Sequence, residues 1–374
     1  MSTSSTTQTF TAVASERFIN AFSAFITSGD FLEITREFEH DFDNKFCNKL
    51  PNLSFRTKNA NAILIDTGVL FIEPDQLLDN NANKNIIISS GIHGNETAPI
   101  EIVQQLVVDI ITHKTQVKHR TLFIIGNPVS MNIAKRFQSE NLNRLFCGKY
   151  KTIQPCYEKH RAKKLELYVS DFFTSKHSAL VIDHSASNYH YDLHTAIRNS
   201  KYEKFAIYPY QGEKPWDKEQ LSFMNACGVN TILFGHAPSG TFSYFSSANY
   251  SAYAFTVELG KVKPFGENNM PSFSPMYDTL TLFISAQEIQ LKAFDNSDYT
   301  LFNVLTDITK ETDNFKLLVD DSVSNFTNYS IGTQLSSDDE NNYFTTQNGE
   351  SIVFPNAHVG KGQRAALIVV PYKL

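Results

Sequence analysis

The sequence predicts an α/β protein with a mixed but mostly parallel sheet flanked by helices, plus a small C-terminal β-rich domain. In the middle of the chain, short apolar runs such as 85–89 and 121–126 alternate with amphipathic stretches such as 97–113. That alternation is typical of parallel strands covered by helices. Near residue 277 the pattern changes to one helical stretch followed by short strand-like segments. A chain of 374 residues has room for both parts.

We expect three regions along the chain. Residues 1–50 form an N-terminal helical lead-in, because phenylalanines recur at helical spacing between residues 15 and 28. Residues 51–275 form an α/β domain, which starts with a β-hairpin or meander over 53–74 that is broken at Thr67-Gly68. Residues 276–374 form a helix over 277–293 and a C-terminal β domain.

The elements of the α/β domain follow from short apolar runs and from helical periodicity. The expected strands are 85–89, 121–126, 179–183, 190–193, 205–208, 231–234 and 252–259, and the expected helices are 97–113, 155–175 and 217–227. The strands expected in the C-terminal domain are 299–304, 315–318, 351–354 and 365–370. In a sheet of this kind, ligands bind at the carboxyl ends of the strands.

Composition excludes several classes of partner. The 33 basic and 39 acidic residues give a net charge of −6, so no broad basic surface for nucleic acid is expected. No apolar run reaches the roughly 18 residues of a membrane helix. The N-terminus lacks a signal-peptide pattern, and the four cysteines show no CxxC spacing. We therefore expect a cytoplasmic protein with reduced thiols and with no nucleic-acid or membrane partner.

The strongest local motif is Gly91-Ile92-His93-Gly94-Asn95-Glu96, between a predicted buried strand and a predicted helix. An imidazole and a carboxylate three residues apart in such a turn can bind one metal ion, and zinc accepts both ligand types. The same spacing also arises by chance in many proteins. The motif alone therefore leaves a structural role open.

A catalytic zinc needs a third protein ligand and an open position. His190 begins the predicted strand 190–193, and His194 directly follows its end. If this segment is extended, residues four apart are separated by roughly 13 Å, so only one of the two can join the site. His194 is closer to the carboxyl end and is our choice. Asp192 lies on the same face, where it either orients a ligand or serves a plain structural role.

Two further segments end at the same edge of the predicted sheet. One holds Arg136, Asn143 and Arg144, which could bind a carboxylate and polarise a carbonyl, although an ordinary polar surface has the same composition. The other ends in Glu258, which could be a general base or a structural glutamate at a strand end.

Five segments carry a resemblance to a known family. They read GIHGNETAPIEI, NPVSMNIAKRFQSENLNRLF, YDLHTAIR, FTVELGKVKPFGEN and PNAHVGKGQRAALIVVP. In this order they resemble the succinylglutamate desuccinylase/aspartoacylase family, which is related to the zinc carboxypeptidases. The resemblance runs from about residue 50 to the end, and it implies a carboxypeptidase-like fold for residues 51–275, which would be the zinc-dependent catalytic domain.

The resemblance also implies roles for single residues. His93, Glu96 and His194 match the ligands of one Zn²⁺ per subunit. Glu258 matches a general acid/base. The remaining matches are Arg136 for polarising the scissile carbonyl, Asn143 and Arg144 for binding a substrate carboxylate, and Arg198 for a second carboxylate.

The activity implied is zinc-dependent hydrolysis of the amide bond of N-succinyl-L-glutamate to succinate and L-glutamate. In the family this is the last step of the succinylating route of arginine breakdown. The segment after His194 fits the desuccinylase branch better than the aspartoacylase branch. The alternatives are an aspartoacylase-like hydrolase of another N-acyl amino acid, a peptidase that trims C-terminal residues, and a catalytically dead zinc-binding module. The oligomeric state is not predicted.

Overall fold

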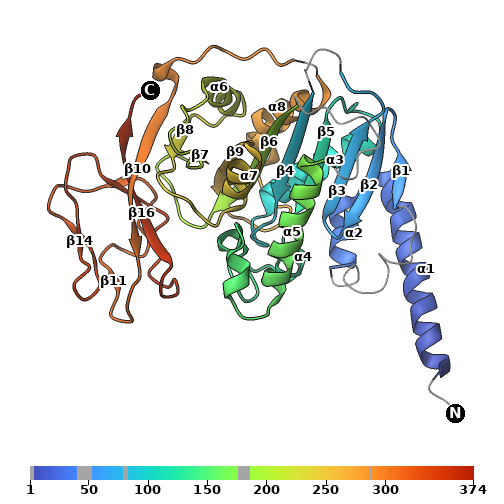
Figure 1. Ribbon diagram of the computed structural model, residues 1–374, viewed down its shortest axis with the longest axis horizontal. Helices are drawn as coiled ribbons and strands as arrows, with labels where there is room; N and C mark the ends of the chain where they lie inside the picture. The colour runs from blue at the N-terminus through green and yellow to red at the C-terminus, as the bar shows by residue number, and fades with distance from the viewer. Residues whose placement is uncertain (1–3, 40–52, 79–82, 176–185, 287) are drawn as a thin grey trace.

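A large mixed sheet runs through most of the described part of the chain. The computed structural model describes residues 4–39, 53–78, 83–175, 186–286 and 288–374. Within these residues the large sheet has 13 strands in the order β1-β2-β3-β5-β4-β6-β9-β7-β8-β10-β16-β15-β12. Figure 1 shows helices packed along its middle and the C-terminal strands extending away from it. The predicted α/β class with a β-rich C-terminal end is confirmed.

The N-terminal region begins with α1 (Ser4–Ser28) and α2 (Phe31–Glu37). Helix α1 starts well before the predicted residue 15, and in Figure 1 its N-terminal end projects away from the sheet. Buried phenylalanines of both helices, including Phe25 and Phe31, pack against the core. Of the predicted hairpin or meander, the structure shows the meander, with β1 (Ser54–Arg56), β2 (Ala60–Asp66) and β3 (Val69–Pro74) paired antiparallel.

The strands that place the functional residues lie at the centre. β4 (Lys84–Ser90) pairs parallel with β5 (Arg120–Ile125) and with β6 (Ser187–Ala196), and β6 pairs parallel with β9 (Tyr253–Lys261). Their carboxyl ends therefore share one edge of the sheet, where ligands of α/β proteins bind. The predicted strand over 179–183 lies outside the described residues.

The sheet continues beyond β9 with a change of direction. β7 (Phe205–Tyr208) runs antiparallel to β9 but parallel to β8 (Thr231–Phe234). The sheet is therefore mixed, as predicted, but among the described strands antiparallel pairings outnumber parallel ones, because the meander and the C-terminal strands join the same sheet.

Each face of the sheet has its own apolar core. One core joins α1 and α2 with α3 (Thr97–Ile111), α6 (Lys218–Ala226) and α8 (Ser274–Ser285). The other core contains α5 (Tyr157–Phe173) and α7 (Phe242–Tyr250). Residues between β5 and α5 form α4 (Pro128–Asn132) and two short 3₁₀ turns, η2 (Leu142–Arg144) and η3 (Lys149–Thr152).

The helix predicted over 277–293 is wrong in its last two turns. α8 ends at Ser285, and Ala286 already has an extended backbone with φ −106° and ψ 148°. The backbone N–H of Lys118 donates to the carbonyl of Ile284, and Nε2 of His119 lies 2.9 Å from the carbonyl oxygen of Ala286. These partners take the place of further helical hydrogen bonds, so tertiary contacts end the helix.

The C-terminal part is joined directly to the central sheet. β10 (Thr300–Thr309) pairs parallel with β8 and antiparallel with β16 (Arg364–Tyr372). β15 (Ser351–Val353) and β12 (Thr327–Asn328) complete this edge. β11 (Lys316–Leu317), β13 (Gln334–Ser337) and β14 (Tyr343–Phe344) form a separate three-stranded sheet.

β10 is longer than the strand that it joins. Its pairing with β8 ends at the Asn303–Phe234 pair, yet it continues to Thr309 alongside β16. In Figure 1 these two strands run on past the ends of β7 and β8. The outer half of β10 and the start of β16 therefore lie beyond the carboxyl edge of the central strands.

Candidate metal centre and catalytic site

The turn between β4 and α3 is shaped by a glycine that the packing requires. A Cβ atom on Gly94 would lie 2.2 Å from backbone atoms of Ser130 and Met131, so only glycine fits there. The N–H of Gly94 also donates to the carbonyl of Arg136 at 3.1 Å. This close backbone contact fixes the turn that carries His93 and Glu96.

The structure brings the three predicted ligands together. His93 lies in the turn, Glu96 is the residue before the first turn of α3, and His194 lies near the end of β6. Each offers one ligand atom, these atoms all lie within 4.8 Å of one another, and all three side chains are buried. The carboxylate of Glu96 makes no capping hydrogen bond to its own helix, so it remains available to the site.

Hydrogen-bond partners determine which nitrogen of each histidine faces the cluster. Nε2 of His93 lies 2.9 Å from Oδ1 of Asn141, an oxygen that also accepts the backbone N–H of Asn143. Nε2 of His194 lies 2.8 Å from Oδ2 of Asp192. Because both acceptors require a proton on Nε2, both Nδ1 atoms can offer a lone pair toward Glu96.

The geometry at His93 fits a shared cation. Its Nδ1 lies 2.8 Å from Oε1 of Glu96, yet the two atoms are not in hydrogen-bond geometry, and this buried nitrogen has no hydrogen-bond partner among the described residues. Nδ1 of His194 lies 2.8 Å from Oε2 of the same carboxylate. Two imidazole nitrogens and a carboxylate oxygen form a donor set that zinc accepts. The three residues could thus hold a metal ion.

The charges around the His93–Glu96–His194 group favour a cation there. Burial alone would raise the pKa of Glu96, but the charges of His93, Arg136 and His194 outweigh it and hold the pKa well below its ordinary value. Burial would likewise lower the pKa of His194, but Asp192 and Glu96 hold it well above its ordinary value. The carboxylates on either side of His194 therefore stabilise a cation between them.

Glu258 lies directly beside His194. The two residues are paired in the register of the parallel strands β9 and β6. Burial and the nearby charge of Glu96 raise the pKa of Glu258 to about 7. Its Oε2 atom is buried and has no hydrogen-bond partner among the described residues. A carboxylate with these properties is suited to accept and return a proton near neutral pH.

Arg136 contacts the same cluster from the loop after α4. Its Nη1 lies 2.5 Å from Oε1 of Glu96, and its side chain is 28% exposed. The guanidinium therefore reaches both the buried cluster and the solvent side of the site.

Asn143 and Arg144 arrive through η2. Oδ1 of Asn143 accepts the N–H of Phe242 at 2.9 Å, and its Nδ2 lies 3.4 Å from Nε2 of His194. Nη1 of Arg144 donates to the carbonyl of Asn143 at 2.8 Å. Burial and the positive charges of Arg364 and Arg136 lower the pKa of Arg144 to about 9. Arg144 is thus a cation at neutral pH and needs further anionic partners.

Comparison with known proteins points to the family of this site. Residues 82–284 match the model for the succinylglutamate desuccinylase/aspartoacylase catalytic domain, and residues 297–372 match the AstE/AspA barrel-sandwich hybrid domain. The chain belongs to the succinylglutamate desuccinylase/aspartoacylase family.

Curated relatives and solved structures agree with this membership. The succinylglutamate desuccinylase of Pseudoalteromonas atlantica is 47% identical over 83% of this chain and 87% of its own length. That of Idiomarina loihiensis is 42% identical over 91% of this chain and 95% of its own length. The structure of the Vibrio parahaemolyticus enzyme matches with a TM-score of 0.77 at 34% identity, covering 91% of this chain and 94% of that one.

Arg198 is the predicted site residue whose side chain is bonded away from the His93–Glu96–His194 group. Its Nη1 donates to the backbone carbonyl of Asp321, in the C-terminal β region. Among the described residues, it forms no hydrogen bond with the other predicted site residues. Its role in binding a carboxylate stays a prediction.

Asn141 was not among the predicted site residues, and the role of Asp192 was left open. Asp192 belongs to a buried chain of polar contacts. Oγ of Ser89 lies 2.5 Å from Oδ1 of Asp192 and 2.9 Å from Nε2 of His190, whose Nδ1 lies 2.7 Å from Oγ of Ser246. His190, the rejected ligand candidate, therefore supports the residues around His194 from within the sheet. The two-residue spacing of a strand was the signal for Asp192, whereas no spacing indicated Asn141.

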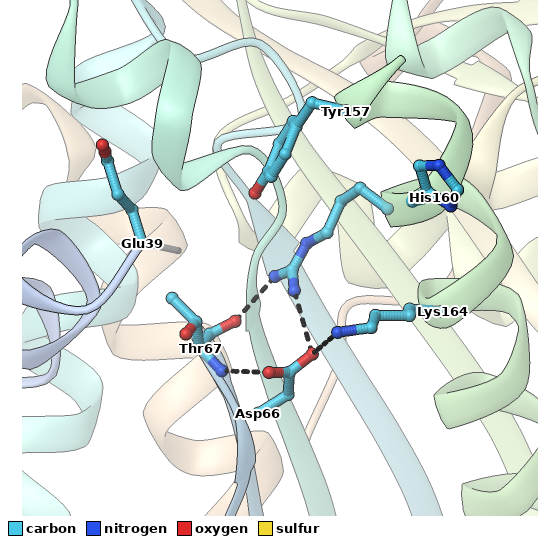
Figure 2. Close-up of a pocket in the computed structure, with 7 residues that line it drawn as sticks. Glu39, Asp66, Thr67, Tyr157, His160 and Lys164 are labelled. Atoms are coloured by element: carbon cyan, nitrogen blue, oxygen red, sulfur yellow. Dashed lines mark hydrogen bonds and ion pairs between the residues drawn. The ribbon is translucent and has the colours of Figure 1, made fainter. Parts of the chain in front are cut away.

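A second polar pocket lies near the end of β2, between α5 and the first helices. Asp66, Thr67 and Lys164 line it (Figure 2), together with Arg161. Arg161 donates to the carbonyls of Gly126 at 2.7 Å, Thr67 at 2.8 Å and Ile125 at 3.1 Å, and its Nη1 lies 3.5 Å from Oδ2 of Asp66. Because these polar groups bind one another, we interpret this pocket as structural support for the sheet edge.

Proposed function

We propose that this member of the family hydrolyses the amide bond of N-succinyl-L-glutamate to succinate and L-glutamate. The observation that carries the proposal is the buried His93–Glu96–His194 group with Glu258 paired beside it. It occurs in a chain that is 40–47% identical to relatives named succinylglutamate desuccinylase. The reaction would complete the succinylating route of arginine breakdown.

We propose zinc as the cofactor, one per chain, held by Nδ1 of His93, Nδ1 of His194 and the carboxylate of Glu96. When bound, zinc supplies a Lewis acid that polarises a carbonyl and lowers the pKa of water. Asn141 and Asp192 keep each imidazole in the required orientation by accepting its Nε2 proton.

Glu258 is proposed to move the proton. Its carboxylate takes a proton from the attacking water and returns it to the nitrogen of the leaving L-glutamate. A pKa raised to about 7 by burial and by Glu96 suits both steps, because the group can be deprotonated for attack and protonated for departure.

The arginines are proposed to act on the negative charges of substrate and transition state. Arg136 already reaches the cluster and can donate to the oxyanion that forms at the scissile carbonyl. Arg144 would bind a substrate carboxylate, with Asn143 beside it. We expect Arg144→Ala to raise KM more than it lowers kcat, and an unchanged KM with a reduced kcat would contradict that role.

The substrate is a small molecule, and we place the reaction in the cytoplasm. The three described cysteines, Cys147, Cys156 and Cys227, are free thiols, which is the usual state in that compartment. Within the described residues, none of the helices combines the length and apolar character that a bilayer crossing requires.

The test is a turnover assay with purified chain that has been stripped of metal and then given one equivalent of zinc. We expect release of L-glutamate from N-succinyl-L-glutamate, with only background release before zinc is added. N-acetyl-L-aspartate tests the aspartoacylase-like alternative on the same preparation. Hydrolysis of N-acetyl-L-aspartate without hydrolysis of N-succinyl-L-glutamate would contradict the proposal, and loss of both would favour a binding module.

A further inference from the structure

Arg364 belongs to the C-terminal part of the chain, yet its charge acts on Arg144 of the catalytic part. It is the first residue of β16 and pairs with Thr309, the last residue of β10. This stretch of β10 runs beyond the end of β8, where the carboxyl edge of the central strands lies. The C-terminal strands thus deliver an arginine to the edge that holds His194 and Glu258.

The guanidinium of Arg364 is poorly satisfied by the protein itself. Its nearest charged partner is Asp307, with Nη1 and Oδ1 3.9 Å apart, although its side chain is only 24% exposed. The same carboxylate also faces Nε2 of His236 at 3.9 Å. Among the described residues, the guanidinium donates no hydrogen bond. Donors of a partly exposed cation that the protein leaves unused are open to acceptors from water or from a bound ligand.

Arg364 also belongs to a group of like charges. Its positive charge acts on Arg144, and Arg136 acts on Arg144 in the same sense. Arg136 has Glu96 at 2.5 Å, whereas Arg144, within the described part of the chain, has only the backbone carbonyl of Asn143 within hydrogen-bond distance. Three guanidinium groups therefore lie near one another, and of these Arg136 is the one in direct contact with Glu96. A ligand with several carboxylates would supply acceptors to the other two.

We propose that Arg364 binds a second carboxylate of the substrate, separate from the carboxylate that Arg144 binds. The inference rests on the proposed function, because N-succinyl-L-glutamate carries three carboxylates. Arg364 fits this task better than Arg198, whose guanidinium is bonded to the carbonyl of Asp321. Arg364 is therefore a specificity-determining residue, which the C-terminal domain adds to a site built by the catalytic domain.

The experiment compares four substrates, one complete and three that each lack one carboxylate. N-Butanoyl-L-glutamate lacks the succinyl carboxylate, N-succinyl-4-aminobutyrate lacks the α-carboxylate, and N-succinyl-L-norvaline lacks the side-chain carboxylate. The zinc-loaded wild type, Arg364→Gln, Arg364→Lys and Arg144→Gln are assayed with each. Lys361→Gln is the matched control, since it removes a cation from the same segment that is paired with Asp313 at the surface.

We expect Arg364→Gln to lower kcat/KM for N-succinyl-L-glutamate by roughly 10- to 150-fold, the effect of losing a hydrogen bond to a charged group. The difference in kcat/KM between wild type and Arg364→Gln should disappear with one of the three analogues, because that analogue lacks the carboxylate that Arg364 binds. The difference in kcat/KM between wild type and Arg144→Gln should disappear with a different analogue. Arg364→Lys should recover part of the activity with the same analogue pattern, and Lys361→Gln should stay within about twofold of wild type.

Three results would overturn the inference. Arg364→Gln could leave kcat/KM unchanged, or it could lower all four values by the same factor, which a structural role would do. The two arginines could also lose their effects on the same analogue. If Arg364→Gln does not fold by circular dichroism, Arg364→Lys decides by the same comparison. A wild type that does not hydrolyse N-succinyl-L-glutamate contradicts the proposed function, whereas an active wild type with an unaffected Arg364→Gln contradicts only this inference.

Discussion

At the level of single residues, the chemistry of the site depends on which nitrogen of each histidine is free. Asn141 and Asp192 each hold an Nε2–H, so Nδ1 of both histidines faces Glu96. Neither partner would contact the ion itself. Both nevertheless determine how strongly the site binds it, because a misoriented or protonated imidazole is not a ligand.

Asp192→Asn tests this orientation. An amide can present its N–H₂ group to Nε2, which would favour the wrong tautomer of His194. We expect zinc affinity to fall roughly 10- to 100-fold, measured by competition with a chromophoric chelator. Asp339→Asn, on an exposed turn, is the control and should bind zinc like wild type. Equal affinity of Asp192→Asn and wild type would show that Asp192 has no part in orienting the ligand.

Glu258→Gln tests the proton transfer. The amide keeps the size of the side chain but cannot accept a proton, so we expect zinc content to stay at one per chain while kcat falls by several orders of magnitude. Both quantities are measured on the same preparation, by metal analysis and by the rate of glutamate release. Near-normal turnover in the zinc-loaded variant would remove Glu258 from the mechanism.

The residues near the ion could be predicted from sequence only where a strand or turn imposes their spacing. His93 and Glu96 share a turn, and Asp192 and His194 share one face of a strand. Asn141 and Arg364 could not be found this way, because each is brought in by a contact between distant segments. Arg364 lies more than 200 positions from Arg144, and no local pattern links them.

At the level of helices and strands, the site depends on segments that end at one sheet edge. The register of β6 against β9 places His194 beside Glu258. Apolar runs predicted these strands because they are buried on both faces. The end of α8 was not predicted, because its last carbonyls are bound by Lys118 and His119 of another segment, and helical periodicity contains no information about such partners.

Arg161 tests the support of this edge from α5. Its side chain is buried and donates to three backbone carbonyls near the ends of β2 and β5, while facing Asp66. We expect Arg161→Met to lower the free energy of unfolding by about 3–5 kcal/mol, because it leaves Asp66 and these carbonyls buried with fewer partners. Urea unfolding measures the change.

The matched control for Arg161 is on the same helix. Lys164 reaches Oδ2 of Asp66 at 3.4 Å, but its side chain is 32% exposed, so Lys164→Met should cost less than about 1 kcal/mol. If the two substitutions destabilise the chain equally, the support comes from helix packing in general. A folded Arg161→Met protein should keep its zinc affinity, since Arg161 is not among the residues that contact the His93–Glu96–His194 group.

At the level of the whole molecule, one continuous sheet joins the catalytic part to the C-terminal strands. The pairing of β8 with β10 makes the connection. The sequence predicted both parts, because helical and strand-like stretches change near residue 277. It did not predict that the two parts share a sheet, since the pairing of distant strands depends on tertiary structure.

Stability of the whole molecule should depend on pH through His119, which lies between the start of β5 and the end of α8. Burial and the nearby charge of Lys84 lower the pKa of His119 from 6.5 to about 4. Between these values the unfolded chain binds the proton and the folded chain does not. The contribution of His119 is therefore fully present above pH 6.5 and is lost as the pH falls toward 4.

His119→Gln isolates this contribution, because the amide can still donate to the carbonyl of Ala286 but does not titrate. The free energy of unfolding of metal-free wild type, relative to His119→Gln, should fall by about 2–3 kcal/mol between pH 7.5 and pH 4.5. Urea unfolding of both proteins at the two pH values gives the difference. A difference that stays constant would show that His119 is protonated equally in both states.

The most direct test of the account is anomalous diffraction at the zinc edge from crystals grown with one equivalent of zinc per chain. We predict one strong anomalous peak, which marks a zinc ion at roughly 2.0–2.2 Å from Nδ1 of His93, Nδ1 of His194 and a carboxylate oxygen of Glu96. A peak at another position, or a zinc ion that contacts fewer than all three side chains, would contradict the proposed metal site.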